Sequence, residues 1–392
     1  MNPLRWLTSL LHNQQQQQPP TVQEAFYGLD HALLNITLPP PSMWMNLGYW
    51  KDTTSFPTAC AALLDQVLIT AGLLSPDGGP LPHSSTKTLR MLDVGIGCGD
   101  QSLRILGYTK KTDGDNAGDG EVNEYGGLRP LFDEYVGITS LPVQARFAGE
   151  RVRRVQEEQL SSEKEEMRKY SSSTATTTAK TKTRARIFCA DAAKPASWTE
   201  DIHSSLESYT RVSTKSKEDT SSTQDANEDQ EKEPQKHDSE AKDETEEETY
   251  LLALDTLYHF TPSRLPLLKY TNKTLHANLL AFDLLLPSHP LPLMTRLLLR
   301  LLCLFTSTPY SNFLTESQYR DLLIEAGYDD SKIEFRDISE HVFPGVAAFM
   351  KRRVEEARMF GVKGVGKYKG AGVVFRWWAT GVVKGAVVVA RI

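Results

Sequence analysis

Three glycines at alternate positions form the part of this sequence that most directly indicates a ligand site. Gly95, Gly97 and Gly99 follow Asp93 and a short apolar run that is typical of a buried strand. Glycine adopts positive φ without strain and lets the backbone come within contact distance of a ligand. The N-terminus of a following helix favours a carboxylate or a phosphate. The pattern therefore predicts a ligand-binding turn between a strand and a helix.

The spacing of these glycines distinguishes the turn from the dinucleotide-binding motif. The pattern is G-x-G-x-G, with Asp93 two residues before the first glycine, whereas dinucleotide folds prefer G-x-G-x-x-G. The tighter spacing resembles the nucleoside-binding loop of class I S-adenosylmethionine methyltransferases. The resemblance implies that Asp93, Gly95, Gly97 and Gly99 bind S-adenosylmethionine as the cofactor. A simple structural turn is the alternative.

A second segment, residues 135–145, resembles the second-strand motif of sterol and tocopherol C-methyltransferases. Many class I enzymes place an acid at the end of this strand to hold the ribose hydroxyls, and Thr139 takes that position here. One hydroxyl is a weaker ribose ligand than a carboxylate. The resemblance implies cofactor contacts from Thr139 and from Gln144, which lies in the following helix.

Asp191 follows the third predicted strand, at the position where this family usually accepts a hydrogen bond from the adenine amino group. The resemblance implies that the backbone N–H of Ala192 faces the same ring. An acid that caps a helix or stabilises a turn is the alternative for Asp191.

Asp255, Tyr258 and His259 follow the fourth predicted strand, in a segment that lies under the transferred methyl group in this family. We expect Asp255 to fix the loop and His259 to act as a base or to orient the acceptor. Tyr258 is counted with them as a candidate catalytic residue. Histidine suits proton transfer because its unperturbed pKa is near neutrality. A purely structural histidine is the alternative.

Tyr49 and Trp50 end a segment, residues 46–50, that resembles an N-terminal motif of small-molecule methyltransferases. Aromatic residues of that motif close over the cofactor, whose sulfonium is a cation that aromatic faces stabilise when water is excluded. We therefore expect both residues to bind substrate, in an acceptor pocket that also includes His259 and residues 291–313. An aromatic pair that caps the core is the alternative.

Strands and helices alternate along the sequence. The predicted strands are residues 89–94, 134–139, 186–190, 250–254, 279–286, 333–338 and 386–392, and the predicted helices include residues 58–74, 142–159, 262–274 and 315–326. The last helix has a capping-box sequence at Thr315 and Gln318 and ends at Gly327. This alternation predicts an α/β fold with a Rossmann-like, mainly parallel, seven-stranded sheet that carries helices on both faces.

Three polar segments are expected to interrupt this order without changing it. Residues 1–21 are predicted to be disordered, and residues 22–392 to form a single methyltransferase domain with insertions at 108–127, 160–183 and 200–249. Residues 201–249 contain 16 acidic and 6 basic residues, and they are too poor in apolar residues to offset their ordering entropy. The rest of the chain has a net charge of +4, against −6 for the whole.

Charge and cysteine usage exclude several classes of protein. Outside residues 201–249 the chain is only mildly positive, which is too little charge to predict nucleic-acid binding. The four cysteines show neither C-x-x-C spacing nor a zinc-ligand pattern, so we expect no metal and a reducing compartment. The N-terminus lacks a secretory signal, which indicates the cytoplasm, with a mitochondrial presequence as the alternative.

Residues 291–305 form the longest apolar run, which falls short of the ~18 residues that a membrane-spanning helix needs. Arg296 and Arg300 interrupt the run on one helical face. The pattern predicts an amphipathic helix that either packs on the core or makes transient contact with a membrane surface.

These residues and the resemblance predict an S-adenosylmethionine-dependent methyltransferase that acts on a small, partly apolar acceptor. The apolar run favours a lipid, sterol, quinone or polyketide-like acceptor. Two other classes compete with this interpretation. A nicotinamide oxidoreductase would need the longer glycine spacing and an acid after the second strand. A non-catalytic, cofactor-binding interaction protein would use the acidic segment for docking.

Overall fold

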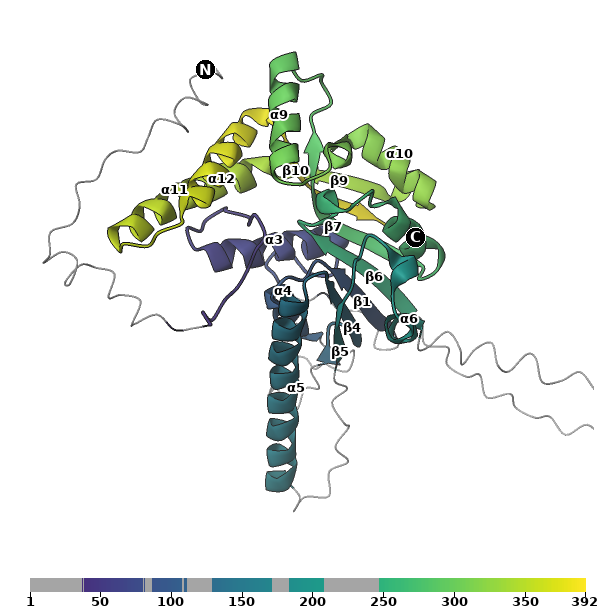
Figure 1. Ribbon diagram of the computed structural model, residues 1–392. Coiled ribbons are helices and arrows are strands. Elements are labelled where there is room, and N and C mark those ends of the chain that lie inside the picture. The colour runs from purple at the N-terminus through teal and green to yellow at the C-terminus, as the bar shows by residue number, and fades with distance from the viewer. Residues whose placement is uncertain are drawn as a thin grey trace, which may run out of the picture.

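A computed structural model describes residues 37, 39–79, 81, 87–107, 109–110, 129–170, 183–207 and 247–392. Its central sheet has eight strands, seven of which follow the order β5-β4-β1-β6-β7-β10-β9 (Figure 1). These seven are β1 (Thr88–Val94), β4 (Glu134–Thr139), β5 (Arg184–Cys189), β6 (Glu247–Leu254), β7 (Ala277–Leu286), β9 (Ile333–Asp337) and β10 (Lys384–Ala390). Neighbours from β5 to β7 are parallel, and β10 is antiparallel to β7 and β9. The predicted Rossmann-like, mainly parallel α/β fold is confirmed.

Three further strands are two residues long. β8 (Leu314–Thr315) pairs with the end of β7. β2 (Thr109–Lys110) and β3 (Arg129–Pro130) pair with each other in a separate sheet.

The chain changes direction across the sheet at β1. From β1 it passes to β4 and β5 on one side, and it then returns to β6 on the other side. In open α/β sheets, such a switch point opens a crevice at the carboxyl ends of the strands, where ligands bind. The glycine loop begins where β1 ends, so the topology places it at this crevice.

Helices cover both faces of the sheet, so its inner strands are buried on both sides, whereas the edge strands β5 and β9 are partly exposed. Leu89 of β1 belongs to one core cluster and Leu92 to the other, because successive side chains of a strand point to opposite faces. The first core includes residues of α3 (Phe56–Ala71), α4 (Asp100–Gly107), α5 (Pro142–Tyr170), α9 (Leu293–Phe305), α11 (Ser339–Met359) and α12 (Gly366–Trp377). The second includes residues of α6 (Glu200–Glu207), α8 (Leu265–Lys273) and α10 (Glu316–Ala326).

The termini of α10 follow the predicted signals. Thr315 Oγ1 accepts from the Gln318 backbone N–H at 3.3 Å, and Gln318 Oε1 accepts from the Thr315 backbone N–H at 3.0 Å. Gly327 ends the helix with a φ of 117°, a conformation in which a side chain would be strained. The predicted helix at residues 315–326 is confirmed.

Two of the predicted insertions are shorter than expected. α5 ends at Tyr170 rather than near residue 159, because the Glu, Lys and Arg residues of this stretch are good helix formers. The acidic segment begins as α6, which buries Ile202, and ends inside β6. The remaining parts, at 171–182 and 208–246, lie outside the described residues, as do residues 1–21 and 111–128.

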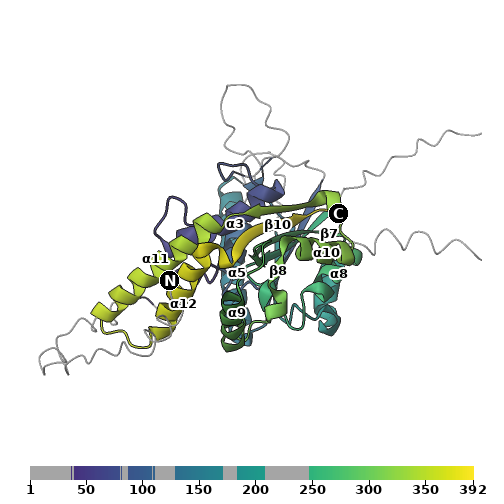
Figure 2. The same ribbon diagram turned by 90° about the horizontal axis from the view of Figure 1, so that it is seen from above.

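A helical hairpin between β9 and β10 is absent from the predicted elements. It consists of α11 and α12, which pack side by side and project from the body of the molecule (Figures 1 and 2). A π-turn, η6 (Trp378–Val382), connects α12 to β10. In the part of the chain that the structure describes, no helix has the length and apolarity needed to cross a membrane.

Candidate active site

A cavity of about 560 Å³ opens at the carboxyl ends of β1, β4, β5 and β6. Its lining comes from within five segments, at positions 43–46, 95–101, 138–144, 190–194 and 254–261. The structure therefore brings together most of the predicted site. The predicted residues that line the cavity are Gly95, Gly97, Thr139, Gln144, Asp191, Ala192, Asp255, Tyr258 and His259.

The three glycines of the loop have positive φ values of 80°, 56° and 87°, but their roles differ. A Cβ on Gly95 would lie 2.5 Å from Thr256 Oγ1, and one on Gly99 would lie 2.8 Å from Ala148 Cβ. Both positions therefore need glycine for packing, and Gly99 does not line the cavity. At Gly97 a Cβ would meet only Met45 Sδ, at 3.8 Å. Gly97 is thus the position where the backbone lies open to a ligand.

Asp93 lies beneath the loop rather than in the cavity. Its side chain is fully buried and accepts hydrogen bonds from Gln101 Nε2 and from the Tyr135 hydroxyl, both at 2.6 Å. Burial raises the pKa of Asp93 to about 7, although both hydrogen bonds oppose the shift. Asp93 and Gly99, which the resemblance assigns to the cofactor, are not among the cavity-lining residues: Asp93 holds α4 and β4 against the loop, and Gly99 packs against α5.

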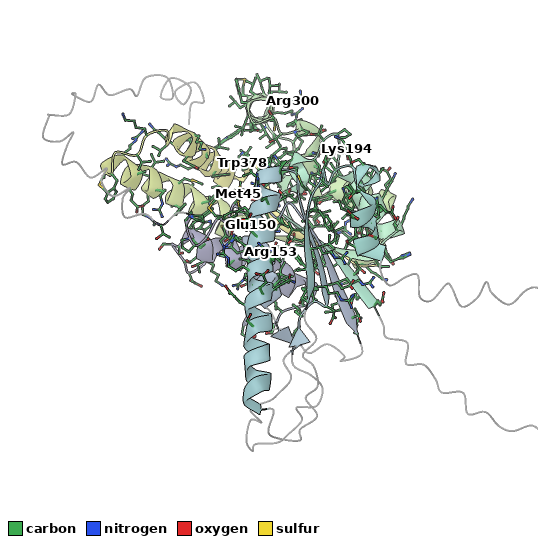
Figure 3. All side chains as sticks on the ribbon, turned by 60° about the horizontal axis from the view of Figure 1, so that its bottom comes forward. Met45, Glu150, Arg153, Lys194, Arg300 and Trp378 are labelled. Atoms are coloured by element: carbon green, nitrogen blue, oxygen red, sulfur yellow. The ribbon has the colours of Figure 1, made fainter. Side chains whose placement is uncertain are left out.

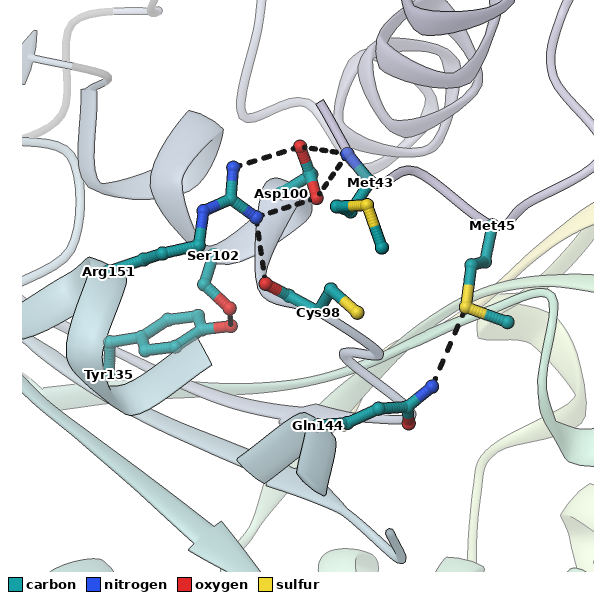
Figure 4. A network of polar contacts seen from close by, with 8 residues as sticks. All are labelled: Met43, Met45, Cys98, Asp100, Ser102, Tyr135, Gln144 and Arg151. Carbon is teal, nitrogen blue, oxygen red and sulfur yellow. Dashed lines mark hydrogen bonds and ion pairs between the residues drawn. The ribbon is translucent and has the colours of Figure 1, made fainter. Parts of the chain in front are cut away.

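Thr139 and Gln144 form the wall at the end of β4. The Thr139 hydroxyl donates to Gln144 Oε1 at 2.9 Å, and Gln144 Nε2 lies 3.5 Å from Met45 Sδ (Figure 4). Thr139 is buried, whereas Met45 is 69% exposed at the mouth of the cavity. The hydroxyl and amide groups of this wall suit a ligand that carries hydroxyl groups.

Asp191 lies at the end of β5 and is engaged by its own turn. Its Oδ1 accepts from the Ala193 backbone N–H at 3.0 Å, and its Oδ2 lies 2.9 Å from Lys194 Nζ. The side chain nevertheless remains exposed in the cavity wall beside the buried Ala192. Asp191 thus stabilises its own turn and also lies where its carboxylate can accept a hydrogen bond from a ligand.

The segment after β6 places one carboxylate under the cavity. Asp255 has a φ of 59°, which Asp tolerates better than most residues. Its Oδ1 accepts from the Tyr258 hydroxyl at 3.0 Å, and its Oδ2 accepts from the Leu47 backbone N–H at 2.9 Å. Burial raises the pKa of Asp255 to about 7. Asp255 therefore fixes the segment as predicted, and it also holds the N-terminal segment.

His259 ends the short 3₁₀ turn η3 (Leu257–His259). Its Nδ1 lies 3.4 Å from Thr308 Oγ1, and its ring packs against Tyr258 with centroids 4.2 Å apart. Burial lowers the pKa of His259 from its usual 6.5. Burial therefore favours the neutral form of the imidazole, which is the form that can accept a proton.

Residues 43–47 form a strap over the glycine loop, which the sequence did not predict. The Met43 backbone N–H lies 3.1 and 3.2 Å from the two Asp100 carboxylate oxygens, and Leu47 is held by Asp255. Arg151 of α5 pairs with Asp100 at 2.8 Å and donates to the Cys98 carbonyl oxygen at 2.8 Å (Figure 4). Asp100, the acid directly after the third glycine, was the only sequence feature that pointed to this strap. Its partners Met43 and Arg151 are distant in the sequence.

Asn312 supports the turn at His259 from behind. Its Nδ2 donates to the carbonyl oxygens of Tyr258 and Phe260, at 3.1 and 2.6 Å. The Asn312 carbonyl oxygen accepts from Arg264, which forms an ion pair with Asp283, and both charged side chains are buried. A buried pair of this kind tolerates the loss of neither partner.

The structure gives Tyr49 and Trp50, the residues expected to bind substrate, a packing role. Both are buried outside the cavity lining. Tyr49 packs edge-on against His341, while Trp50 packs against Phe349 and donates its indole N–H to the Leu47 carbonyl oxygen at 2.8 Å. They thus cap the core of the N-terminal segment, and Met43 to Asn46 of the same segment face the cavity instead.

Residues 291–313, the expected other side of the acceptor pocket, contribute no residue to the lining of this cavity. The segment contacts the site from outside, through Thr308. In the described part of the chain, no group of three or more His, Cys, Asp or Glu side chains could hold a metal ion.

Comparison with known proteins yields only structural neighbours, since no family model and no curated protein matches the chain. The chain is similar to the cyclase SpnF, with 17% identity, 95% of this chain and 97% of that chain covered, and a TM-score of 0.45. It is similar to the cyclopropane synthase MmaA2 from Mycobacterium tuberculosis, with 12% identity, 89% and 90% covered, and a TM-score of 0.46. It is also similar to the Haemonchus contortus phosphoethanolamine N-methyltransferase 2 in complex with S-adenosyl-L-methionine, with 11% identity, 87% and 58% covered, and a TM-score of 0.44.

The sheet order and the glycine loop define the class of this protein. It is a Rossmann-like α/β protein whose β1 ends in a glycine loop, with a cavity at the carboxyl ends of its parallel strands.

Proposed function

We propose that this protein is an S-adenosylmethionine-dependent methyltransferase that acts on a small, partly apolar acceptor. The observation that carries the proposal is the cavity itself. Its wall presents, in strand order, an open glycine backbone at Gly97, a hydroxyl at Thr139 and a carboxylate at Asp191. These groups suit the amino-acid, ribose and adenine parts of one extended ligand.

The residues present fit this cofactor. The backbone at Gly97 is accessible because a Cβ there would meet no atom closer than 3.8 Å. Thr139 and Gln144 supply polar atoms where ribose hydroxyls would lie, and Asp191 supplies an acceptor for an amino group. Gly97, Thr139, Gln144 and Asp191 would hold the cofactor, with Ala192 beside the ring.

The chain's own residues would align the reactants and exclude water, which is the main requirement of a displacement reaction. S-adenosylmethionine supplies an activated methyl group on a sulfonium. Asp255 and Tyr258 hold the segment below the reacting atoms, and the strap at 43–47 covers the glycine loop. Neutral His259 at the cavity wall can take a proton from a carbon or oxygen acceptor.

The acceptor side of the cavity is partly apolar. Met43, Trp44, Tyr258 and Phe260 contribute to the lining of the cavity, as His259 does. These side chains suit an acceptor with an apolar body and a single polar reacting group, such as a lipid, sterol, quinone or polyketide-like molecule.

Isothermal titration of the full chain with S-adenosylmethionine and with NAD tests the cofactor. We expect binding of the first ligand only. Gly97→Ala, which puts a side chain at a φ of 56°, should weaken binding at least about tenfold. Gly149→Ala is the matched control, since its Cβ would meet only Ile187, at 3.9 Å.

A folded wild-type chain that binds NAD as well as S-adenosylmethionine, or that binds neither, contradicts the proposal. Transfer of a labelled methyl group to components of a lipid extract then separates an enzyme from a protein that only binds the cofactor.

A further inference from the structure

Helix α9 exposes an apolar face to solvent. Leu293, Leu304 and Phe305 are 79%, 75% and 82% exposed, and Met294, Leu297 and Leu301 are also exposed. A helix that serves only to cover the core would expose polar side chains instead. Solvent exposure of so many large apolar side chains on one helix indicates a surface that binds something.

The positions of these residues define one continuous face. Leu293, Leu297, Leu301 and Leu304 follow one another at intervals of four, four and three residues, so they share one side of the helix. Leu299 and Cys303 are buried on the opposite side. Arg296 and Arg300 lie between the two sides, and Figure 3 shows Arg300 at the edge of the molecule. The face is therefore apolar and bordered by cations along one edge.

The helical hairpin carries a second exposed apolar group at its outer end. Met359, Phe360, Val362 and Tyr368 are exposed where α11 ends and α12 begins. Cationic residues surround them in the sequence: Arg358, Lys363, Lys367 and Lys369. The outer end of the hairpin thus combines apolar and cationic side chains, as α9 does.

The charge pattern of both elements is one-sided. Residues 284–315, which include α9, contain no acidic residue, and neither do residues 357–392, which carry seven Lys and Arg residues. The chain as a whole is acidic, with a net charge of −6. Both apolar surfaces therefore lie within stretches that attract anions.

We propose that α9 and the outer end of the α11–α12 hairpin bind the surface of an anionic membrane. Interfacial binding combines burial of an apolar helix face at the headgroup level with attraction of Lys and Arg to anionic lipids. Two such signals together give stable but reversible attachment. A second copy of the chain is the less suitable occupant, because like-charged surfaces would face each other.

The membrane-binding surface is connected to the cavity. Thr308, which follows α9, contacts His259, and Phe313 packs on Tyr258 with ring centroids 6.2 Å apart. Attachment through α9 would therefore bring the cavity close to the lipid. This membrane proposal rests on the proposed function and makes it more specific: the acceptor is a lipid-soluble molecule that resides in the membrane.

Vesicle co-sedimentation of the full chain tests the membrane-binding surface without requiring turnover. Phosphatidylcholine vesicles with phosphatidylserine should bind the protein, and vesicles of phosphatidylcholine alone should bind it less. Leu304→Glu with Phe305→Glu, and separately Lys363→Glu with Lys367→Glu, should each weaken binding at least about tenfold. The matched controls are Ile324→Glu on α10 and Arg153→Glu on α5, both exposed, which should bind like the wild type.

Absence of binding to anionic vesicles by a wild-type chain that still binds S-adenosylmethionine overturns the membrane proposal and leaves the proposed function intact. Equal loss in the control variants also overturns it. Sedimentation velocity gives the remaining outcome: a dimer that Leu304→Glu with Phe305→Glu converts to a monomer would assign the face to a second copy instead. Loss of S-adenosylmethionine binding with vesicle binding retained would contradict only the proposed function.

Discussion

Two buried carboxylates determine how the ends of β1 and β6 meet the cavity. Asp93 is held by Gln101 and Tyr135, and Asp255 by Tyr258 and the Leu47 backbone. Burial raises the pKa of both to about 7. At the scale of single residues, these two acids therefore position the backbone around the cavity, whereas Asp191 is the acid whose side chain lies exposed in the cavity wall.

The buried Asp93 should make the stability of the fold depend on pH. Its pKa rises from 3.8 to about 7 on folding, so between these values the folded state keeps a proton that the unfolded chain has released. The free energy of unfolding therefore falls as pH rises through this window, by at most about 1.4 kcal/mol per pH unit. Urea unfolding of Asp93→Asn should show a stability that rises relative to wild type with pH. Parallel curves would contradict this assignment.

His259 should titrate below the usual histidine range. Burial lowers its pKa from 6.5, and the contact with Thr308 at 3.4 Å is too long to be the main cause. NMR titration of the His259 imidazole should give a midpoint below 6.5. The midpoint should stay below 6.5 in the Thr308→Val variant. A midpoint at or above 6.5 would contradict the burial of the imidazole as the factor that sets its pKa.

At the scale of elements, the strap at residues 43–47 depends on one ion pair. Arg151 of α5 holds Asp100, which in turn holds the Met43 backbone N–H. Arg151→Gln should lower S-adenosylmethionine affinity about tenfold, because a charge-assisted bond contributes roughly 1.5–3 kcal/mol. Titration of Arg153→Gln provides the control, since its pair with Glu157 is exposed and contributes little. Equal affinities in the two variants would show that the strap does not shape the site.

The turn at His259 depends on Asn312 in a similar way. Asn312→Ala leaves the carbonyl oxygens of Tyr258 and Phe260 without their donor, which should cost about 1–3 kcal/mol of unfolding free energy. Thr315→Ala removes the α10 cap and should cost about 1 kcal/mol. The two variants can be compared by thermal unfolding and by ligand titration. Only Asn312→Ala should also weaken S-adenosylmethionine binding. Equal effects of the two variants on this binding would show that Asn312 has no role in the site.

The elements that the sequence predicted well are those with local signals. β1 and β7 are mostly apolar because helices bury both of their faces, and α10 has its cap residues at fixed offsets. The hairpin was missed because residues 361–372 contain five glycines, which argue against a helix. Packing of α12 against α11 overrides that propensity.

At the scale of the whole molecule, the cavity is assembled from segments that are far apart in the sequence. The glycine loop, Thr139, Asp191 and the residues after β6 were predictable because strand order places their ends together. The contacts between Met43 and Asp100 and between Leu47 and Asp255 span 57 and 208 positions, and no local pattern encodes such pairs. The sequence therefore predicted which strand ends form the site, but not which segment covers it.

Ligand binding should consequently stabilise the whole described fold and not one part of it. The cavity exists only when the strap, β1, β4, β5 and β6 are all in place, so the unfolded chain cannot bind. S-adenosylmethionine at 100 times its Kd should then add about 2.7 kcal/mol to the free energy of unfolding. Urea unfolding followed by both tryptophan fluorescence and circular dichroism should show one coincident transition that the ligand shifts, as a single domain requires. NAD should leave it unchanged, and Gly97→Ala should show a reduced shift. A ligand that shifted only one of two separate transitions would show that residues 22–392 do not fold as one domain.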